Sequence, residues 1–262
     1  MKSILDFNRA RQEGRPIVMV TAYDAPMARL VAESEADVIL VGDSAAMVVH
    51  GLPSTVHATL DMMVLHTAAV RRGAPDRVIV ADLPFLSFRQ GRETAVRAAG
   101  ALIQAGATAV KLEGVTGHED VVAHLVGSGI PVMGHLGLTP QSIYKFGTFT
   151  VRAREEAEAR KLIEDAHLLE DAGCFAIVLE KIPAELATRV AKELTVPVIG
   201  IGAGSGVDGQ VLVTHDMLGL TKGFSPRFIR KYLDLYDDIK GAVSHYIEDV
   251  KLQDFPNQKE QY

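Results

Sequence analysis

Short runs rich in Val, Ile and Ala recur along the chain and are separated by longer stretches with helical periodicity. The runs lack strict alternation of apolar and polar residues, which is typical of strands in a parallel sheet covered by helices. We predict strands within the runs Ile17–Asp24, Val38–Ser44, Val78–Pro84, Ala109–Gly114, Pro131–Gly137, Ala176–Pro183, Pro197–Gly204 and Val211–Met217.

The stretches between these runs carry helix signals. Thr94–Gly106 and Arg154–Gly173 are predicted helices, and each stops on a glycine before the next strand, the usual C-terminal signal. His66–Pro75 resembles the end of a helix, because its arginine pair suits a helix C-terminus, where cations are favoured.

A repeated strand–helix unit in a chain of 262 residues predicts an α/β fold of the (β/α)₈ TIM barrel type. A doubly wound open sheet is the competitor, but the segment "VGDSAAM" lacks the glycine-rich dinucleotide fingerprint of that fold. No linker or composition break divides the chain. We therefore predict a single domain over 1–262, with extra C-terminal helices over Pro226–Lys251 and a polar tail at roughly 252–262.

Charge and composition exclude several classes of partner. The net charge is −6 and no Lys/Arg cluster forms a basic stripe, so we expect no nucleic-acid binding. No apolar run is long enough to span a membrane, and the N-terminus lacks the apolar core of a signal peptide. Cys174 is the only cysteine, which rules out an intramolecular disulfide and favours a reducing, cytoplasmic location.

Polar residues stand where the predicted strands end, and the carboxyl ends of barrel strands carry the chemistry in this fold. Barrel closure should bring these residues to one opening. They are Tyr23 and Asp24, Asp43 and Ser44, Asp82, Lys111 and Glu113, His135, Glu180, Gly202 and Gly204, and His215 and Asp216.

Three of the carboxylates suit a metal ion. Asp43, Asp82 and Glu113 would repel one another around a single cavity, and a bound cation removes that penalty. An all-oxygen set of this kind favours a hard divalent ion, with Mg²⁺ as the first choice. No His/Cys spacing of the zinc type occurs in the chain.

Each of these residues also has a purely structural interpretation. The structural roles are helix capping by Asp43 and Ser44, a turn position for Asp82, a salt bridge between Lys111 and Glu113, a satisfied core position for His135 and a helix start for Glu180. Their shared position at the ends of different strands favours the functional interpretation. For the glycines of "GIGAG", a tight turn is favoured over a phosphate site, because no P-loop Lys or Ser follows.

Ordered phrases along the chain carry a family resemblance. They are "TAYDAPMA", "VGDSAAMVVHG", "HTAAVRRGAP", "ADLPF", "VKLEG", "GHLGLTPQS", "VLE", "PVIGIGAG", "DGQVLV" and "HDMLG". Together they resemble the ketopantoate hydroxymethyltransferase family from about Asp6 to Tyr246. The resemblance implies a (β/α)₈ barrel enzyme of pantothenate biosynthesis. Such an enzyme transfers a one-carbon unit from 5,10-methylenetetrahydrofolate to 3-methyl-2-oxobutanoate. The resemblance also implies a large homo-oligomer, with a decamer as the suggested size.

The resemblance also implies roles for individual residues. Asp43, Asp82 and Glu113 match metal ligands, and Glu180 matches the proton acceptor. The positions that contact the keto acid are matched by Asp43, Ser44, Asp82 and Lys111. The hypothesis for the reaction is a Mg²⁺-stabilised enolate formed when Glu180 removes the C3 proton, with Lys111 neutralising the substrate carboxylate. His135 is a candidate to hydrogen-bond the new hydroxyl group.

The chain departs from the family pattern at two places. His50 stands where the family usually has Gln, and Gly147–Ala153 reads "GTFTVRA" where the family usually reads close to "GGYKVQG". The second segment is a candidate mobile rim loop.

Two alternatives stay open. One is a metal-dependent lyase or mutase of the isocitrate lyase type, although the Lys-Cys-Gly-His lid loop of its lyases is missing, since Cys174 enters a predicted strand. The other is a barrel that binds a keto acid without catalysis.

Overall fold

The computed structural model describes residues 1–223 and 226–262. These residues form two compact units, Met1–Val213 and Thr214–Tyr262. In the first unit the strands form a closed barrel in the order β1-β2-β3-β4-β5-β6-β7-β8, and neighbouring strands are parallel. The predicted (β/α)₈ fold class is therefore confirmed, whereas the single domain over 1–262 stays a prediction.

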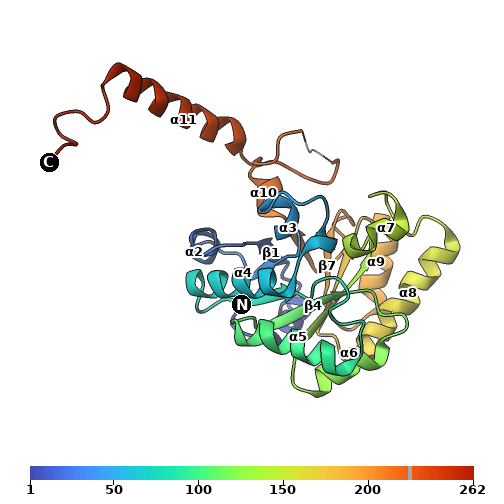
Figure 1. Cartoon of the computed structure of the whole chain (residues 1–262). Helices are drawn as coiled ribbons and strands as arrows, with labels where there is room; N and C mark the ends of the chain where they lie inside the picture. The colour runs from blue at the N-terminus through green and yellow to red at the C-terminus, as the bar shows by residue number, and fades with distance from the viewer. Residues whose placement is uncertain (224–225) are drawn as a thin grey trace. The chain divides into compact units, whose positions relative to one another are not determined.

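The strands of the barrel are β1 (Ile17–Thr21), β2 (Val38–Val41), β3 (Val78–Asp82), β4 (Ala109–Glu113), β5 (Val132–Gly137), β6 (Ala176–Glu180), β7 (Val198–Ile201) and β8 (Gly209–Leu212). The first seven lie inside the predicted runs. In Figure 1 they occupy the centre of the first unit.

The prediction for the eighth strand, Val211–Met217, is wrong at both ends. The strand starts at Gly209, which pairs with Ile17 of β1 and Ile199 of β7. A Cβ atom at Gly209 would lie 2.5 Å from the carbonyl oxygen of Ile17, so close packing of the barrel requires glycine there. The residues after the strand form helix α10 (Thr214–Met217), which places His215 and Asp216 on a helix of the second unit.

Helices surround the barrel (Figure 1). They are α1 (Leu5–Gln12), α2 (Ala25–Glu33), α3 (Ala45–Val48), α4 (Leu60–Gly73), α5 (Arg92–Gln104), α6 (Glu119–Gly127), α7 (Ile143–Phe146), α8 (Glu156–Asp171) and α9 (Ala184–Glu193), with short 3₁₀ turns η1 (Thr55–His57) and η2 (Pro140–Ser142). The predicted helices correspond to α5 and α8, and the arginine pair lies in the last turn of α4. Gly106 and Gly173 follow α5 and α8 with φ of 111° and 91°, a left-handed backbone that favours glycine.

Alternation along the strands separates two apolar layers. Outward-facing side chains such as Ile79 and Leu112 pack against the helices. Inward-facing side chains fill the barrel near the amino ends of the strands, and they include Ile17, Met19, Val38, Leu40, Val78, Val80, Met133, Val178, Ile199 and Val211. Phe7 of α1 belongs to this inner cluster and packs edge-on against Phe175, with ring centroids 5.0 Å apart. The apolar filling leaves the carboxyl ends of the strands for polar residues.

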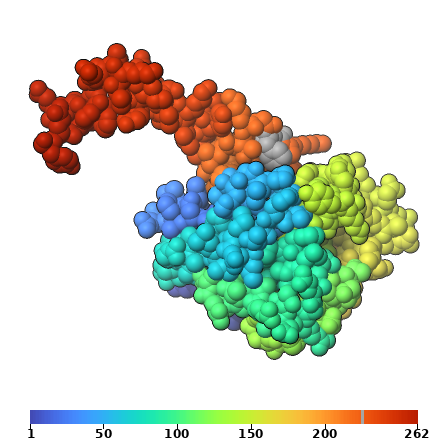
Figure 2. Space-filling view, viewed as in Figure 1, coloured from blue at the N-terminus to red at the C-terminus, as the bar shows by residue number. Residues whose placement is uncertain are grey.

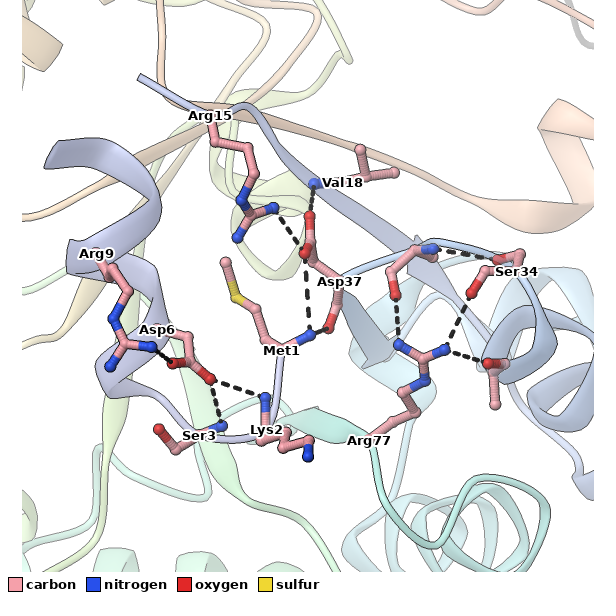
Figure 3. Close-up of polar contacts among 12 residues, drawn as sticks. Met1, Lys2, Ser3, Asp6, Arg9, Arg15, Val18, Ser34, Asp37 and Arg77 are labelled. Carbon is pink, nitrogen blue, oxygen red and sulfur yellow. Dashed lines mark hydrogen bonds and ion pairs between the residues drawn. The ribbon is translucent and has the colours of Figure 1, made fainter. Parts of the chain in front are cut away.

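Asp37 anchors the start of β2 to the start of β1 (Figure 3). One carboxylate oxygen accepts the backbone N–H of Val18 at 3.0 Å, and the other accepts Arg15 Nη1 at 2.9 Å. Arg77, which precedes β3, donates to the backbone carbonyls of Ala32, Ser34 and Ala36 beside it. Asp37 is only 8% exposed, so its carboxylate depends on these partners.

Asp37→Asn should lower the free energy of unfolding by about 2 kcal/mol, because the amide presents a donor where the carboxylate accepted bonds from Val18 or Arg15. Urea unfolding of the variant measures the loss. The matched control is Asp76→Asn, at an exposed carboxylate in the loop before β3, which should change stability by less than about 0.5 kcal/mol. Equal stability of both variants would contradict an anchoring role for Asp37.

The second unit contains α10 and the longer helix α11 (Leu235–Leu252). The predicted helix over Pro226–Lys251 therefore starts too early, and Phe224 and Ser225 just before it lie outside the described residues. The backbone N–H groups of Tyr232 and Leu235 donate to the carbonyls of Met217 and Leu218, which draws this part of the chain out of helical geometry. After Leu252 the residues are exposed and form no helix or strand, and the polar tail stays a prediction.

None of the described helices combines the length and the apolar character that crossing a bilayer requires.

Candidate active site

The predicted site residues continue the inward-facing series of the strands. On β3 the series is Val78, Val80 and Asp82, so the carboxylate occupies the next inward position beyond the apolar filling. Strand register then places these residues next to one another, since Asp82 pairs with Lys111 and Glu113 pairs with His135 across adjacent strands. The structure thus gathers Asp43, Asp82, Lys111, Glu113, His135 and Glu180 at the carboxyl end of the barrel.

Asp82 and Lys111 form a buried ion pair. Lys111 Nζ lies 3.0 Å from Asp82 Oδ1, and both side chains are at most 5% exposed. The second oxygen, Asp82 Oδ2, accepts the backbone N–H of Asp43 at 3.1 Å. Asp82 is therefore more than a turn residue. The purely structural interpretation of the sequence had paired Lys111 with Glu113, whereas the ion-pair partner in the structure is Asp82.

His135 joins two carboxylates from different strands. Its Nδ1 lies 3.4 Å from Glu113 Oε1, and its Nε2 lies 3.4 Å from Glu180 Oε2. Burial and the neighbouring Lys111 lower the pKa of His135, but the contacts with Glu113 and Glu180 outweigh them and raise this pKa to about 9. The two carboxylates thus favour the protonated form of His135, which pairs with Glu180.

Gln141 belongs to this cluster, although it was not among the predicted site residues. Its side-chain Nε2 donates to Asp43 Oδ2 at 2.8 Å and to the carbonyl of Leu83 at 2.9 Å. Its backbone N–H donates to Glu113 Oε2 at 2.9 Å. Gln141 therefore fixes Asp43 relative to Glu113. Gln141 lies in η2, beyond the end of β5, so a search for polar residues at strand ends does not find it. The only sequence signal for Gln141 was its position in the family phrase "GHLGLTPQS".

Ser44 is tied to the neighbouring strand rather than to a helix. It precedes α3 but makes no side-chain capping bond there, and its hydroxyl lies 2.8 Å from the Tyr23 hydroxyl. The carbonyl of Tyr23 in turn accepts His66 Nδ1 at 2.6 Å, and His66 Nε2 lies 2.8 Å from His50 Nε2. Tyr23 thus reaches the cluster and links it to the divergent His50.

Asp24, by contrast, lies outside the cluster. Its carboxylate caps α2 by accepting the N–H of Met27 at 2.7 Å.

The cluster carries an excess of negative charge. Burial, followed by repulsion from Asp82 and Glu113, raises the pKa of Asp43 well above its usual value. Burial lowers the pKa of Lys111, but the surrounding carboxylates more than compensate and the net shift is upward. One ammonium therefore faces several carboxylates, and a small divalent cation would relieve the repulsion.

The oxygen donors fit such a cation in charge and chemistry, but they are engaged with protein partners. Lys111, Gln141 and His135 contact the carboxylates of Asp82, Asp43 and Glu113, respectively. Within 1–223 and 226–262, no group of three or more His, Cys, Asp or Glu side chains is preassembled around an ion. An ion would therefore have to displace some of these contacts.

The glycine-rich turn after β7 is a close-packed turn, as favoured from the sequence. Gly202 and Gly204 have φ of 63° and 82°, and a Cβ at Gly204 would lie 2.4 Å from the Cβ of Ala184. Glycine is required there by backbone conformation and by the approach of α9.

The divergent segment Gly147–Ala153 is anchored beside the cluster at its carboxyl end. The N–H of Arg152 donates to the carbonyl of Lys181, the residue after Glu180, at 2.8 Å. The N–H of Ala153 donates to Glu158 Oε2 at 2.8 Å. The mobility proposed for this loop stays a prediction.

Solved structures share the barrel fold. A putative phosphonomutase from Burkholderia cenocepacia has a TM-score of 0.65 at 16% identity and covers 95% of this chain and 100% of its own. Phosphonopyruvate hydrolase in complex with oxalate and Mg²⁺ has a TM-score of 0.64 at 12% identity, covering 99% and 93% of the two chains. At these identities the similarity concerns the fold alone.

Curated relatives are much closer in sequence. A 3-methyl-2-oxobutanoate hydroxymethyltransferase from Parabacteroides distasonis is 58% identical over 253 residues, covering 96% of this chain and 93% of the relative. The enzyme of the same name from Flavobacterium johnsoniae is 53% identical over 262 residues, covering 100% and 95%. The model of the family described as ketopantoate hydroxymethyltransferase matches residues 1–258. The chain therefore belongs to the ketopantoate hydroxymethyltransferase family.

Proposed function

We propose that the protein transfers a hydroxymethyl group from 5,10-methylenetetrahydrofolate to 3-methyl-2-oxobutanoate and forms 2-dehydropantoate (ketopantoate) for pantothenate and coenzyme A synthesis. The observation that carries the proposal is the buried cluster at the barrel mouth. It combines a cation for a substrate carboxylate, Lys111, with a carboxylate that pairs with His135, Glu180. Relatives named for this activity support the choice of substrate.

Mg²⁺ is the proposed metal, with Asp43, Asp82 and Glu113 as its ligands. Burial, followed by repulsion from Asp82 and Glu113, raises the pKa of Asp43, and this repulsion supports a cation at this place. When bound, the ion supplies electrostatic stabilisation of the negative charge that develops on the ketone oxygen as the C3 proton leaves.

Lys111 and Ser44 are proposed to bind and orient the keto acid. The pKa of Lys111 is raised, so its ammonium stays charged throughout the neutral range and neutralises the substrate carboxylate. The Ser44 hydroxyl is positioned by Tyr23 and has a second hydrogen-bonding direction left for the substrate. The carboxylates of Asp43 and Asp82 complete the substrate surroundings.

Glu180 is the proposed general base. Its side chain is 16% exposed, compared with 4% for Asp82 and 3% for Glu113, so Glu180 offers a more accessible carboxylate than these two. It takes the C3 proton, and C3 then bonds to the methylene carbon of the folate while one of the two carbon–nitrogen bonds of that carbon breaks. The oxygen of a water molecule bonds to the same carbon as the second carbon–nitrogen bond breaks. The C3 proton and one water proton end on the two folate nitrogens, and tetrahydrofolate leaves. His135, which pairs with Glu180, is also the proposed hydrogen-bond donor to the new hydroxyl.

The test is product formation from both substrates, followed by mass spectrometry. Ketopantoate should form with Mg²⁺, disappear with excess EDTA and return when Mg²⁺ is restored. Calorimetric binding of 3-methyl-2-oxobutanoate without any product would support the non-catalytic alternative and overturn the proposal.

A lyase of the isocitrate lyase type is the second candidate, because the fold neighbours include 2,3-dimethylmalate lyase at a TM-score of 0.59 and 16% identity. Burial raises the pKa of the Cys174 thiol to about 12, so this cysteine is unsuited to acid–base chemistry. Cleavage of longer 2-hydroxy acids by the purified protein would favour the lyase.

Gln141→Met should lower kcat/KM about 10- to 100-fold, because Asp43 loses the amide that holds it, while the backbone bond from residue 141 to Glu113 remains. Initial rates at limiting keto acid measure the loss. Gln104→Met, at an exposed position that ends α5, is the matched control and should match the wild type. A Gln141→Met enzyme with wild-type kcat/KM would show that Asp43 needs no support.

We also propose a homo-oligomer, with a decamer as the suggested size, in a reducing cytoplasm, without nucleic-acid partners. Apolar side chains recur along α11 at helical spacing, and they are exposed to solvent in the single protein chain. They are Tyr236, Ile239, Val243, Ile247 and Val250. Such a stripe on an exposed helix favours contact with another copy. Light scattering coupled to gel filtration tests the state, and a monomeric mass would contradict it.

A further inference from the structure

A cavity of about 320 Å³ opens beside the cluster of Asp43, Asp82, Lys111, Glu113, His135 and Glu180. It is lined by Gly114 and Leu136, the residues that directly follow Glu113 on β4 and His135 on β5. The N–H of Gly114 donates to the carbonyl of His135 at 2.9 Å, which fixes the two strand ends together. The cavity is therefore only about one residue, roughly 3.3 Å along a strand, from the catalytic side chains.

The cavity lies outside the barrel wall. Leu136 alternates with the inward-facing His135 and so points away from the barrel interior. The opposite walls come from the segment that contains Phe146 and Arg152, and from Leu162 on α8. In Figure 2 this segment, in yellow-green, lies beside α8, in yellow, on the viewed face. A ligand there occupies a different space from the keto acid, within reach of the same centre.

Cations outnumber carboxylates around the cavity. Arg89, Lys145, Arg152 and Lys161 line it, against Glu158 and Asp165. Arg152 pairs with Glu158, and Lys161 pairs with Asp165. Lys145 is exposed and forms no ion pair with a residue in the described part of the chain. Two positive charges are therefore left over, and a dianion neutralises them.

The cavity also has an apolar side. Leu136 and Leu162 are 4% and 6% exposed, and the Arg152 guanidinium lies 4.0 Å from the centroid of the Phe146 ring. This combination suits a flat aromatic group that ends in carboxylates. At the barrel mouth Asp43, Asp82 and Glu113 already repel one another, and Lys111 is reserved for the keto acid, so the carboxylates of a second ligand are better neutralised in this cavity.

We propose that this cavity binds the p-aminobenzoylglutamate tail of reduced folate, with Lys145 and Arg89, the two cations left over, facing its carboxylates. The inference rests on the proposed function, in which a reduced folate is the one-carbon donor. The aromatic ring packs on the apolar side, and the pterin end extends toward the centre between Glu113 and Glu180.

The experiment measures equilibrium binding of tetrahydrofolate by calorimetry, in the presence of 3-methyl-2-oxobutanoate. Lys145→Gln should weaken binding about 10-fold, and the double variant with Arg89→Gln by more, because each loses a charge-assisted contact. Lys145→Arg should retain most of the affinity. A tetrahydropterin that lacks the aminobenzoylglutamate tail should bind the wild type and Lys145→Gln equally.

Arg160→Gln is the matched control, because Arg160 is on α8 next to Lys161 but pairs with Glu156 at the surface and does not line the cavity. Its affinity for tetrahydrofolate should equal that of the wild type. Unchanged tetrahydrofolate binding in the double variant, or an equal loss with the tailless pterin, overturns the assignment of the tail. The proposed function fails separately, when the wild type binds tetrahydrofolate but makes no ketopantoate.

Discussion

Glu180→Gln should lower kcat for ketopantoate formation by about 10²- to 10⁴-fold, the usual contribution of a positioned general base. The amide has the shape of the carboxylate and its oxygen can still accept from His135 Nε2, so the site should keep its geometry. The variant cannot take the C3 proton. In D₂O with Mg²⁺ and keto acid, but without folate, the wild type should place deuterium at C3 and the variant should not; proton NMR follows the C3 signal.

Glu185→Gln is the control for this experiment, because Glu185 is an exposed acidic residue in the first turn of α9, close in sequence to Glu180. Its exchange rate should equal the wild-type rate. Exchange that persists in Glu180→Gln would assign the base to another residue.

Lys111→Met should cost the metal-free protein about 3–5 kcal/mol of unfolding free energy at neutral pH, because it leaves buried carboxylates without their cation. The ammonium of Lys111 is 3.0 Å from Asp82, and its attraction also acts on Asp43 and Glu113. Methionine fills a similar volume, so lost packing contributes little. Urea unfolding in EDTA measures the change.

The deficit of Lys111→Met should shrink as the pH falls. Asp43 already has a raised pKa in the folded protein, so the folded state binds a proton more readily than the unfolded chain does. Loss of the ammonium raises the pKa of Asp43 and Asp82 further. The penalty therefore grows from the ordinary pKa of an unfolded Asp, about 3.9, up to the raised folded pKa, and is constant above it. Unfolding at pH 5 and pH 8 compares the two regimes.

Lys192→Met on the exposed face of α9 is the matched control and should cost little at either pH. A Lys111→Met deficit that is small, or that increases toward pH 5, would contradict the charge balance described for the cluster.

The strands were predictable where apolar runs are uninterrupted, because a strand that is buried on both faces has apolar residues at successive positions. The start of β8 was not predictable, since Gly209 is selected by contact with Ile17 and carries no strand propensity. The prediction of α11 was too long, because the backbone partners of Tyr232 and Leu235 lie at the end of α10 and directly after it, where a local sequence pattern does not reveal them.

The site was predictable to the extent that its residues end strands. Asp82, Lys111 and Glu180 were found in this way, and the barrel register then decided their partners. The ion pair of Lys111 with Asp82 depends on the neighbouring strand, so spacing along β4 alone suggested Glu113 as the structural alternative. Gln141 reaches the cluster through a turn beyond β5, a position that no periodicity marks.

Closure of the barrel has a consequence for how copies of the protein can associate. Because β1 pairs with both β2 and β8, the barrel has no outer strand whose backbone donors and acceptors are available to another sheet. The barrel therefore cannot pair edge to edge with a strand of a neighbouring molecule, which is a frequent route to aggregation. Self-association must instead use side-chain surfaces of helices and loops, where complementarity of shape and charge selects the partner.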